Sequence, residues 1–176
     1  MDLTAFIEGI FLLSPRRFGT IAEIMIDRLF NLAPSNTLKY DSKDNDKRIE
    51  IKFSRALKKE EKLQNNNLIA ICKNAFISNR MIKTDETSIS FFDCNIQQVK
   101  PTEFDVLYYG IFFKDKIEIY QINSSNIPLL KNYSAKQHRG NEGEGQFHLN
   151  SSNIEEHRNK YLIKTLTYKQ LYRLLE

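Results

Sequence analysis

The sequence is poor in the residues that cross-link a chain or bind a metal through sulfur. Its 176 residues include only two cysteines, Cys72 and Cys94, which form no C-x-x-C pair. We therefore expect neither a disulfide framework nor a thiolate metal cluster, and a reducing cytoplasm is the simpler location. The three histidines, His138, His148 and His157, match no short metal motif. A zinc site or an HNH-type nuclease is therefore not expected either.

Long apolar runs are also absent. The stretch AFIEGIFLL near the N-terminus contains Glu8, and it has neither a basic leader nor a small-residue cleavage site. No stretch approaches the ~20 apolar residues of a membrane-spanning helix. We expect a soluble, unprocessed protein with no membrane partner.

Charge of neither sign dominates the chain. The 26 lysines and arginines slightly outnumber the 22 aspartates and glutamates, and the pI is about 9.0. This balance suits an anionic partner without requiring one. The length and the 41% hydrophobic content predict a single domain, 1–176, with a substantial core. The 12 phenylalanines and 8 tyrosines mostly follow the apolar segments, which indicates core packing and not a platform for stacking single-stranded bases.

The periodicity of the apolar residues predicts alternating helices and strands. Helical spacing over 3–32, broken at Ser14-Pro15, predicts two helices, and Glu23 and Asp27 lie four residues apart on a polar side of the second. Segments 37–41 and 48–54 predict a β-hairpin around a polar turn. The stretch NLIAICKNAFI fits a helix or a buried strand equally well.

The second half of the chain has a similar mixture of patterns. Segment 88–99 is typical of a strand, and 104–122 predicts a hydrophobic hairpin that turns near Lys114-Asp115. The polar, glycine-containing segment 131–153 predicts a loop, and 154–175 returns to helical periodicity. Together the patterns predict an α/β fold with a mixed central sheet flanked by helices.

One short phrase occurs twice. Residues 46–53 read DKRIEIKF, and residues 115–122 read DKIEIYQI. Strand alternation places Glu50 and Lys52 on one face of the first phrase, whereas the second offers Glu118 and Tyr120 without a lysine. The second phrase is therefore predicted to be sheet scaffold.

The first phrase also follows a predicted strand that ends in an acid. If Asp41 closes that strand, two carboxylates and the ammonium of Lys52 converge at one corner of the sheet, and the Ile51 carbonyl is a natural further ligand. Hydrolysis of a phosphodiester with a divalent metal needs oxygen ligands for a hard cation and positive charge near the phosphate. On its own, a Glu-x-Lys pattern is most often an ion pair on a solvated strand, so the surrounding residues have to decide.

These residues resemble the active site of the PD-(D/E)XK nuclease superfamily, and more narrowly that of a small Type II restriction endonuclease of the group that cuts GCNGC. The resemblance rests on Asp41, on 50–52 within RIEIKFSR, and on Gly19 and Glu23 within FGTIAE. The sequence departs from the family pattern at Tyr40, where a proline usually precedes the acid.

The resemblance implies a restriction-endonuclease-like core and a role for each matching residue. Asp41 and Glu50, with the Ile51 carbonyl, would bind Mg²⁺. Lys52 would orient or activate the attacking water, and Glu23 would assist through a water. The family further implies a homodimer that cuts double-stranded DNA to leave 5′-phosphate ends, in a prokaryotic cytoplasm, together with a separate DNA methyltransferase.

DNA contacts are predicted at two places. Ser54 and Arg55 follow the active strand directly, where phosphates near the cut would lie. In 131–153 the side chains are of types that read base edges or bind phosphates, and the glycines allow close approach to a groove. The candidates there are Lys136, Gln137, His138, Arg139, Asn141, Gln146 and His148.

Three other functions remain open from the sequence. A repair nickase or a junction resolvase of the same superfamily would share the Glu-x-Lys strand. A non-catalytic DNA-binding module would use Glu50 and Lys52 only as a surface ion pair, which contributes at most about 1 kcal/mol. Substitution of these two residues would then leave its activity intact.

Overall fold

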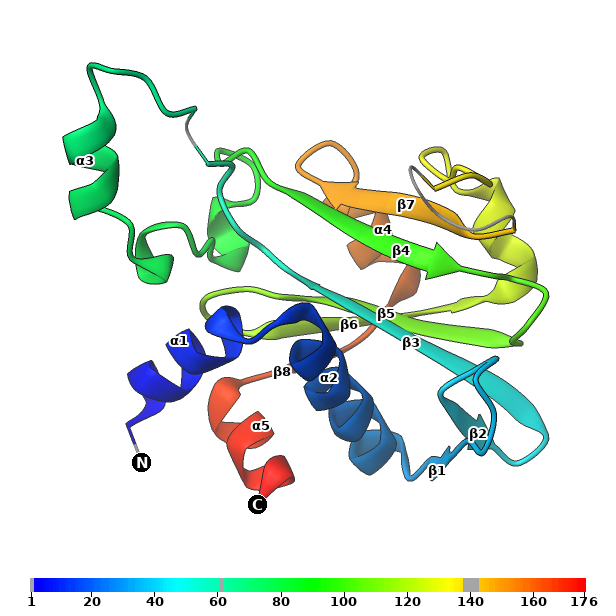
Figure 1. Ribbon diagram of the computed structural model, residues 1–176. Coiled ribbons are helices and arrows are strands. Elements are labelled where there is room, and N and C mark those ends of the chain that lie inside the picture. The colour runs from blue at the N-terminus through cyan, green and yellow to red at the C-terminus, as the bar shows by residue number, and fades with distance from the viewer. Residues whose placement is uncertain (1, 61, 138–142) are drawn as a thin grey trace.

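A mixed β-sheet forms the centre of the fold, as the computed structural model shows for residues 2–60, 62–137 and 143–176 (Figure 1). Strands β3 and β5 run parallel, and every other neighbouring pair in this sheet is antiparallel. In spatial order the strands are β1 (Ala33–Pro34), β2 (Ser42–Asp44), β3 (Lys47–Arg55), β5 (Val106–Phe112), β6 (Ile117–Asn123) and β8 (Leu162–Leu166).

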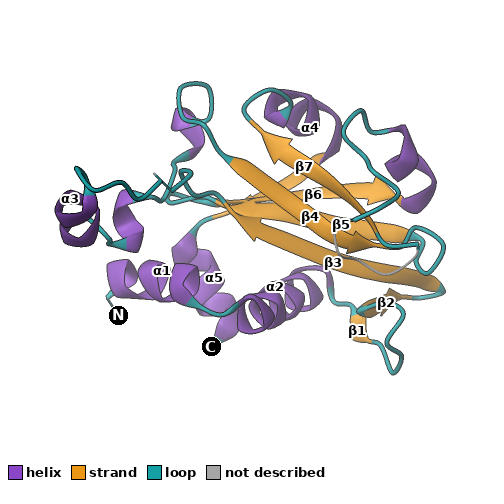
Figure 2. Ribbon diagram, turned by 45° about the horizontal axis from the view of Figure 1, so that its top comes forward, coloured by secondary structure: helices purple, strands orange, loops and turns teal. Residues whose placement is uncertain are grey.

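Different layers cover the two faces of this sheet (Figures 1 and 2). One face packs against α1 (Leu3–Leu12), α2 (Pro15–Phe30) and α5 (Tyr168–Leu175). The other face packs against a two-stranded ribbon and one helix. These are β4 (Asp93–Val99), β7 (Gly145–Asn150) and α4 (Ile154–Tyr161). The predicted α/β architecture, a mixed sheet flanked by helices, is confirmed.

The buried strands explain why the sheet forms where it does. Every residue of β5 is buried, and its sequence VLYYGIF is the continuous apolar run of a central strand covered on both faces. Tyr108 and Tyr109 belong to this core, as their apolar context predicted. The predicted hairpin over 104–122, with its turn near Lys114, is also confirmed.

The N-terminal helices begin and end close to their predicted positions. The Asp2 carboxylate caps α1 by accepting from the N–H groups of Thr4 and Ala5 at 3.0 and 3.1 Å. Pro15 opens α2, and Asn31 ends it in the left-handed region at φ 55°. The stretch that fitted a helix or a strand equally well contains α3 (Leu68–Lys73), which stands away from both sheets (Figure 1).

The hairpin predicted from segments 37–41 and 48–54 is shorter than expected. Residues 37–41 form no strand, because the Ser35 and Thr37 hydroxyls accept from backbone N–H groups two residues later, at 3.1 Å each, and so compete with strand pairing. The hairpin pairs β2 with β3 around Asn45 and Asp46, and Asn45 adopts φ 53°.

Two predictions for the C-terminal part are wrong. The segment 131–153 contains strand β7, whose residues Phe147 and Leu149 alternate inward and pair with β4. The segment 154–175 is not continuously helical, because β8 separates α4 from α5 and pairs with β6. A new capping box at Thr167 then starts α5.

Candidate active site

Asp41 lies against β3 immediately before β2 begins. Its main-chain N–H donates to the Ile49 carbonyl at 2.9 Å, and its Oδ2 accepts from the Ile51 N–H at 2.8 Å. The first bond extends the β2–β3 pairing by one main-chain contact, and the second extends it through the Asp41 side chain. They fix the carboxylate beside the middle of β3.

Glu50 and Lys52 share one face of β3, as the alternation predicted. The Lys52 ammonium forms an ion pair with Glu50 Oε1 and lies 3.8 Å from Asp41 Oδ2. The Lys52 and Asp41 side chains are each 25% exposed, and the Glu50 side chain is 10% exposed. The structure therefore brings together the three residues that the sequence singled out.

Burial controls the protonation of this group. Burial raises the pKa of Glu50 to about 7, although Lys52 opposes the shift. Burial alone would lower the pKa of Lys52, but Glu50 and Asp41 outweigh it, and the net shift is upward. Lys52 is therefore a stable cation here, and Glu50 titrates close to neutral pH.

Helix α2 adds two carboxylates beside Asp41. Burial, followed by the charge of Asp41, raises the pKa of Glu23. The Ser42 hydroxyl donates to Asp27 Oδ1 at 2.5 Å, and burial raises the pKa of Asp27. Asp27 thus ties the helix to the start of β2, next to Asp41. The sequence placed Glu23 and Asp27 on one side of the helix but did not predict the bond to Ser42.

The main chain supplies one more oxygen on this side of β3. The Ile49 carbonyl faces Asp41, from whose N–H it accepts. Carbonyls two residues apart in a strand point the same way, so the Ile51 carbonyl faces the Asp41 side as well. Carboxylates with a carbonyl form the oxygen-only donor set that suits Mg²⁺. Among the described residues, no group of three or more His, Cys, Asp or Glu side chains could hold a metal by itself, so the carbonyl would be needed.

A cavity of about 200 Å³ opens over Asp41, Glu50 and Lys52. Its walls include Gln98 and Lys100 at the end of β4. The sequence did not predict these two residues as part of the site. They reach it because β4 pairs with β7, about 50 residues later in the chain, and this ribbon folds over β3. The remaining lining residues are Leu38, Lys39, Glu103, Phe104 and Glu144.

The predicted contacts at the end of β3 do not line this cavity. The Arg55 Nη1 group donates to the carbonyls of Phe11 and Leu13 at 2.7 and 2.8 Å, and the guanidinium lies 4.7 Å from the centre of the Phe18 ring. Ser54 is half-buried, and its hydroxyl interacts with the buried thiol of Cys94, whose pKa burial raises to about 12. Arg55 therefore holds the end of α1, and its contact with DNA stays a prediction.

Of the predicted contacts in 131–153, those that the structure describes lie on and beside the β4–β7 ribbon. The side chains of Gln146 and His148 bond to neighbours on β4: Asn95 Nδ2 donates to Gln146 at 3.0 Å, and His148 Nδ1 pairs with Asp93 at 2.8 Å. Lys136 is exposed. Gln137 Oε1 accepts from a main-chain N–H of β4, and His138, Arg139 and Asn141 lie outside the described residues.

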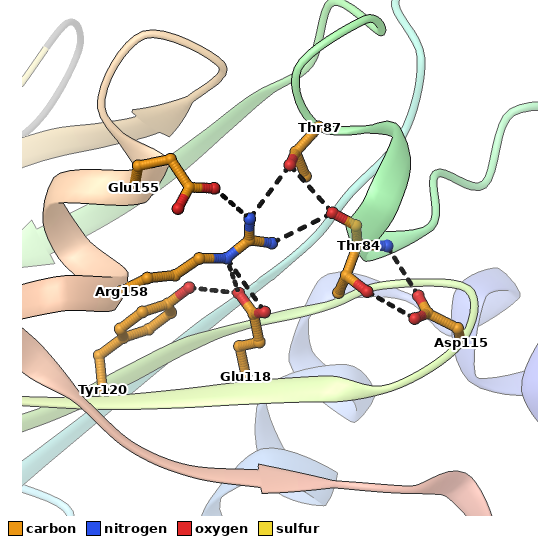
Figure 3. A network of polar contacts seen from close by, with 7 residues as sticks. All are labelled: Thr84, Thr87, Asp115, Glu118, Tyr120, Glu155 and Arg158. Atoms are coloured by element: carbon orange, nitrogen blue, oxygen red, sulfur yellow. Dashed lines mark hydrogen bonds and ion pairs between the residues drawn. The ribbon is translucent and has the colours of Figure 1, made fainter.

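The repeated phrase on β6 has a different environment (Figure 3). Glu118 accepts from Arg158 Nε at 3.1 Å and from the Tyr120 hydroxyl at 2.5 Å. Arg158 also reaches Thr87 and Glu155 at 3.2 and 2.6 Å. The Glu118 side chain is 3% exposed, so its charge is neutralised inside the fold.

Comparisons with protein-family models, with curated proteins and with solved structures found no match to this chain. Within the part of the chain that the structure describes, no helix combines the length and the apolar character needed to cross a bilayer.

Proposed function

We propose that this protein is a Mg²⁺-dependent endonuclease that hydrolyses phosphodiesters of double-stranded DNA. The observation that supports the proposal best is the convergence of Asp41, Glu50 and Lys52 at one cavity. Three lysines, Lys39, Lys52 and Lys100, line the cavity beside four carboxylates. A phosphate would therefore bind there together with a divalent cation.

Asp41, Glu50 and the Ile51 carbonyl would hold the metal. Bound Mg²⁺ supplies charge neutralisation and an acidified water. Asp41 is preorganised for this task because its bond to the Ile51 N–H fixes its carboxylate. Glu50 gains its charge near neutral pH, so a bound cation and the ionised carboxylate favour each other.

Lys52 would contribute fixed positive charge beside the phosphate. Its raised pKa keeps the ammonium protonated, so it donates hydrogen bonds to water or to a phosphoryl oxygen and does not serve as a base. Glu23 approaches the same edge from α2, and a hydrogen bond through water to the site suits its raised pKa.

The narrower part of the proposal is a Type II restriction endonuclease with a restriction-endonuclease-like core. Such an enzyme would act as a homodimer, because a palindromic site that is cut on both strands presents two scissile phosphates related by a two-fold axis. It would leave 5′-phosphate ends and act alongside a separate DNA methyltransferase.

The test incubates the purified protein with unmethylated plasmid and Mg²⁺ and then sequences the fragment ends. We expect discrete fragments with 5′-phosphates from the wild type and none from Glu50→Gln. Nicked circles without linear product would favour a repair nickase or junction resolvase. DNA binding without cutting in Mg²⁺ or Mn²⁺ would contradict the proposal and favour a binding module.

A further inference from the structure

Strand β4 is irregular where it forms the wall of the cavity. It pairs regularly with β7 as far as Ile96, and the register then shifts before Val99. Gln97 and Gln98 together oppose the single residue Gln146, which is the arrangement of a β-bulge. Gln98 adopts φ 57°, in the left-handed region that non-glycine residues rarely occupy.

A side chain from a distant segment holds this bulge in place. The Gln98 N–H donates to Gln137 Oε1 at 2.8 Å. Gln137 is itself fixed, because its main-chain N–H donates to the Glu144 carbonyl at 3.0 Å. Gln137 was predicted to contact DNA. In the structure its amide oxygen supports the backbone of Gln98.

The bulge decides which glutamine faces the cavity. Gln97 and Gln98 are both exposed, but only Gln98 lines the cavity together with Asp41, Glu50 and Lys52. Bulges commonly redirect a side chain next to a functional site. Here the redirected side chain is a neutral amide in a cavity whose other long polar side chains are charged.

The chemistry of the amide differs from that of the lysines beside it. A phosphate offers only acceptors, so Lys39, Lys52 and Lys100 suit it. A glutamine amide offers a donor and an acceptor together, which is what the edge of a base requires. We propose that Gln98 is a specificity residue that hydrogen-bonds to a base edge next to the phosphate held at the Asp41–Glu50–Lys52 site. This inference rests on the proposed nuclease function.

The test compares cleavage rates on a duplex with the preferred site and on its single-base-pair variants. Gln98→Gly removes the amide while keeping a backbone that glycine adopts readily. We expect it to lose roughly 10- to 100-fold of discrimination at one base pair of each half-site and to keep the other preferences. Gln98→Asn retains an amide and tolerates left-handed backbone, so we expect it to restore part of that discrimination.

Gln97→Ala is the matched control, and its sequence preference should equal that of the wild type. Melting temperatures of all three variants report whether the fold is kept. An unchanged preference in Gln98→Gly, or a rate that falls equally on every sequence, would overturn the specificity role while the nuclease function stands. A wild type that cuts no DNA would overturn both.

Discussion

Strands β3 and β6 carry almost the same phrase on the same face of one sheet, yet their acids have different environments. The ladders through β5 align Lys52 with Tyr109 and Tyr109 with Tyr120. Glu118, on β6, is closed in by Arg158 and Tyr120. Glu50, on β3, forms one wall of a cavity.

The element that covers each strand accounts for this difference. Helix α4 lies over β6 and brings an arginine, whose charge is permanent and whose planar group satisfies the carboxylate (Figure 3). Over β3 the β4–β7 ribbon leaves space, and the cation is a lysine on the same strand. Glu118 is scaffold because a cation from another element pairs with it inside the fold. Glu50 is a candidate site because it pairs with a lysine of its own strand at the wall of a cavity.

Removal of the β3 cation should have the largest effect. We expect Lys52→Ala to lower the single-turnover rate of plasmid cleavage by roughly 10²- to 10⁴-fold, because the ammonium no longer stabilises charge at the phosphate. Its melting temperature should fall less than that of Glu118→Gln, because the Lys52 side chain is 25% exposed and Glu50, whose pKa is about 7, can take up a proton when its cation is removed. Cleavage by Lys52→Ala at the wild-type rate would show that Lys52 on β3 takes no part in the reaction.

The matching change on β6 should affect stability and leave the chemistry intact. Glu118→Gln removes the buried carboxylate that pairs with Arg158 and leaves it the exposed carboxylate of Glu155. Loss of one partner of a buried pair costs up to roughly 3–5 kcal/mol. Chemical denaturation measures this loss of unfolding free energy. At temperatures where the variant stays folded, its cleavage rate should match that of the wild type. A rate as low as that of Lys52→Ala would contradict the proposed difference between β3 and β6.

The stability of the region around α4 should also depend on pH. His157 on α4 is buried and bonded to the Tyr109 hydroxyl at 2.8 Å, and burial lowers its pKa from 6.5 to about 4. Between these two values the unfolded chain binds a proton that the folded chain does not. The contribution of His157 to the free energy of unfolding should therefore fall as pH decreases from 6.5 to 4, by up to about 1.4 kcal/mol per unit. Glu50, whose pKa burial raises from 4.5 to about 7, contributes with the opposite sign between those two values.

His157→Gln separates this contribution from that of the carboxylates. Urea denaturation at a series of pH values should show a shallower acid slope for the variant than for the wild type. Equal slopes would mean that His157 is protonated in the folded protein.

The smallest effect concerns the end of β3. Arg55→Gln removes the Nη1 group that donates to the carbonyls at the end of α1, and we expect a stability loss of about 1–3 kcal/mol. DNA affinity as a function of salt should keep its slope in this variant, although it also loses a positive charge. In Lys100→Ala, which alters the cavity wall, the magnitude of the slope should fall by about 1. A slope reduced by about 1 in Arg55→Gln would place Arg55 at the DNA interface.

The sequence predicted those features that depend on residues close together in the chain. The face shared by Glu50 and Lys52 follows from strict alternation within nine residues of one strand. The proline that opens α2 and the apolar run of β5 are equally local signals. Asp41 lies close to Lys52, as predicted, even though the strand expected to hold Asp41 does not form.

Features that depend on distant pairing were missed. Strand β7 lies in a polar, glycine-containing stretch and is stabilised by β4, about 50 residues earlier in the chain. The partner of Glu118 lies 40 residues away on α4, and Gln98 is presented by a bulge whose support is 39 residues away. Periodicity within a window contains no information on such contacts.

Asp41 and Glu50 together form the proposed site for a hard cation, whereas Glu118 on β6 is not expected to bind one. Calorimetric titration of Mn²⁺ into the wild type, Asp41→Asn and Glu118→Gln tests this difference directly. Asparagine keeps an oxygen that can accept from the Ile51 N–H, so Asp41→Asn changes the charge and preserves the local fold. We predict one Mn²⁺ per chain in the wild type and in Glu118→Gln, and an affinity roughly 10- to 100-fold weaker in Asp41→Asn. Equal affinity in all three proteins, or no binding by the wild type, would contradict the assignment.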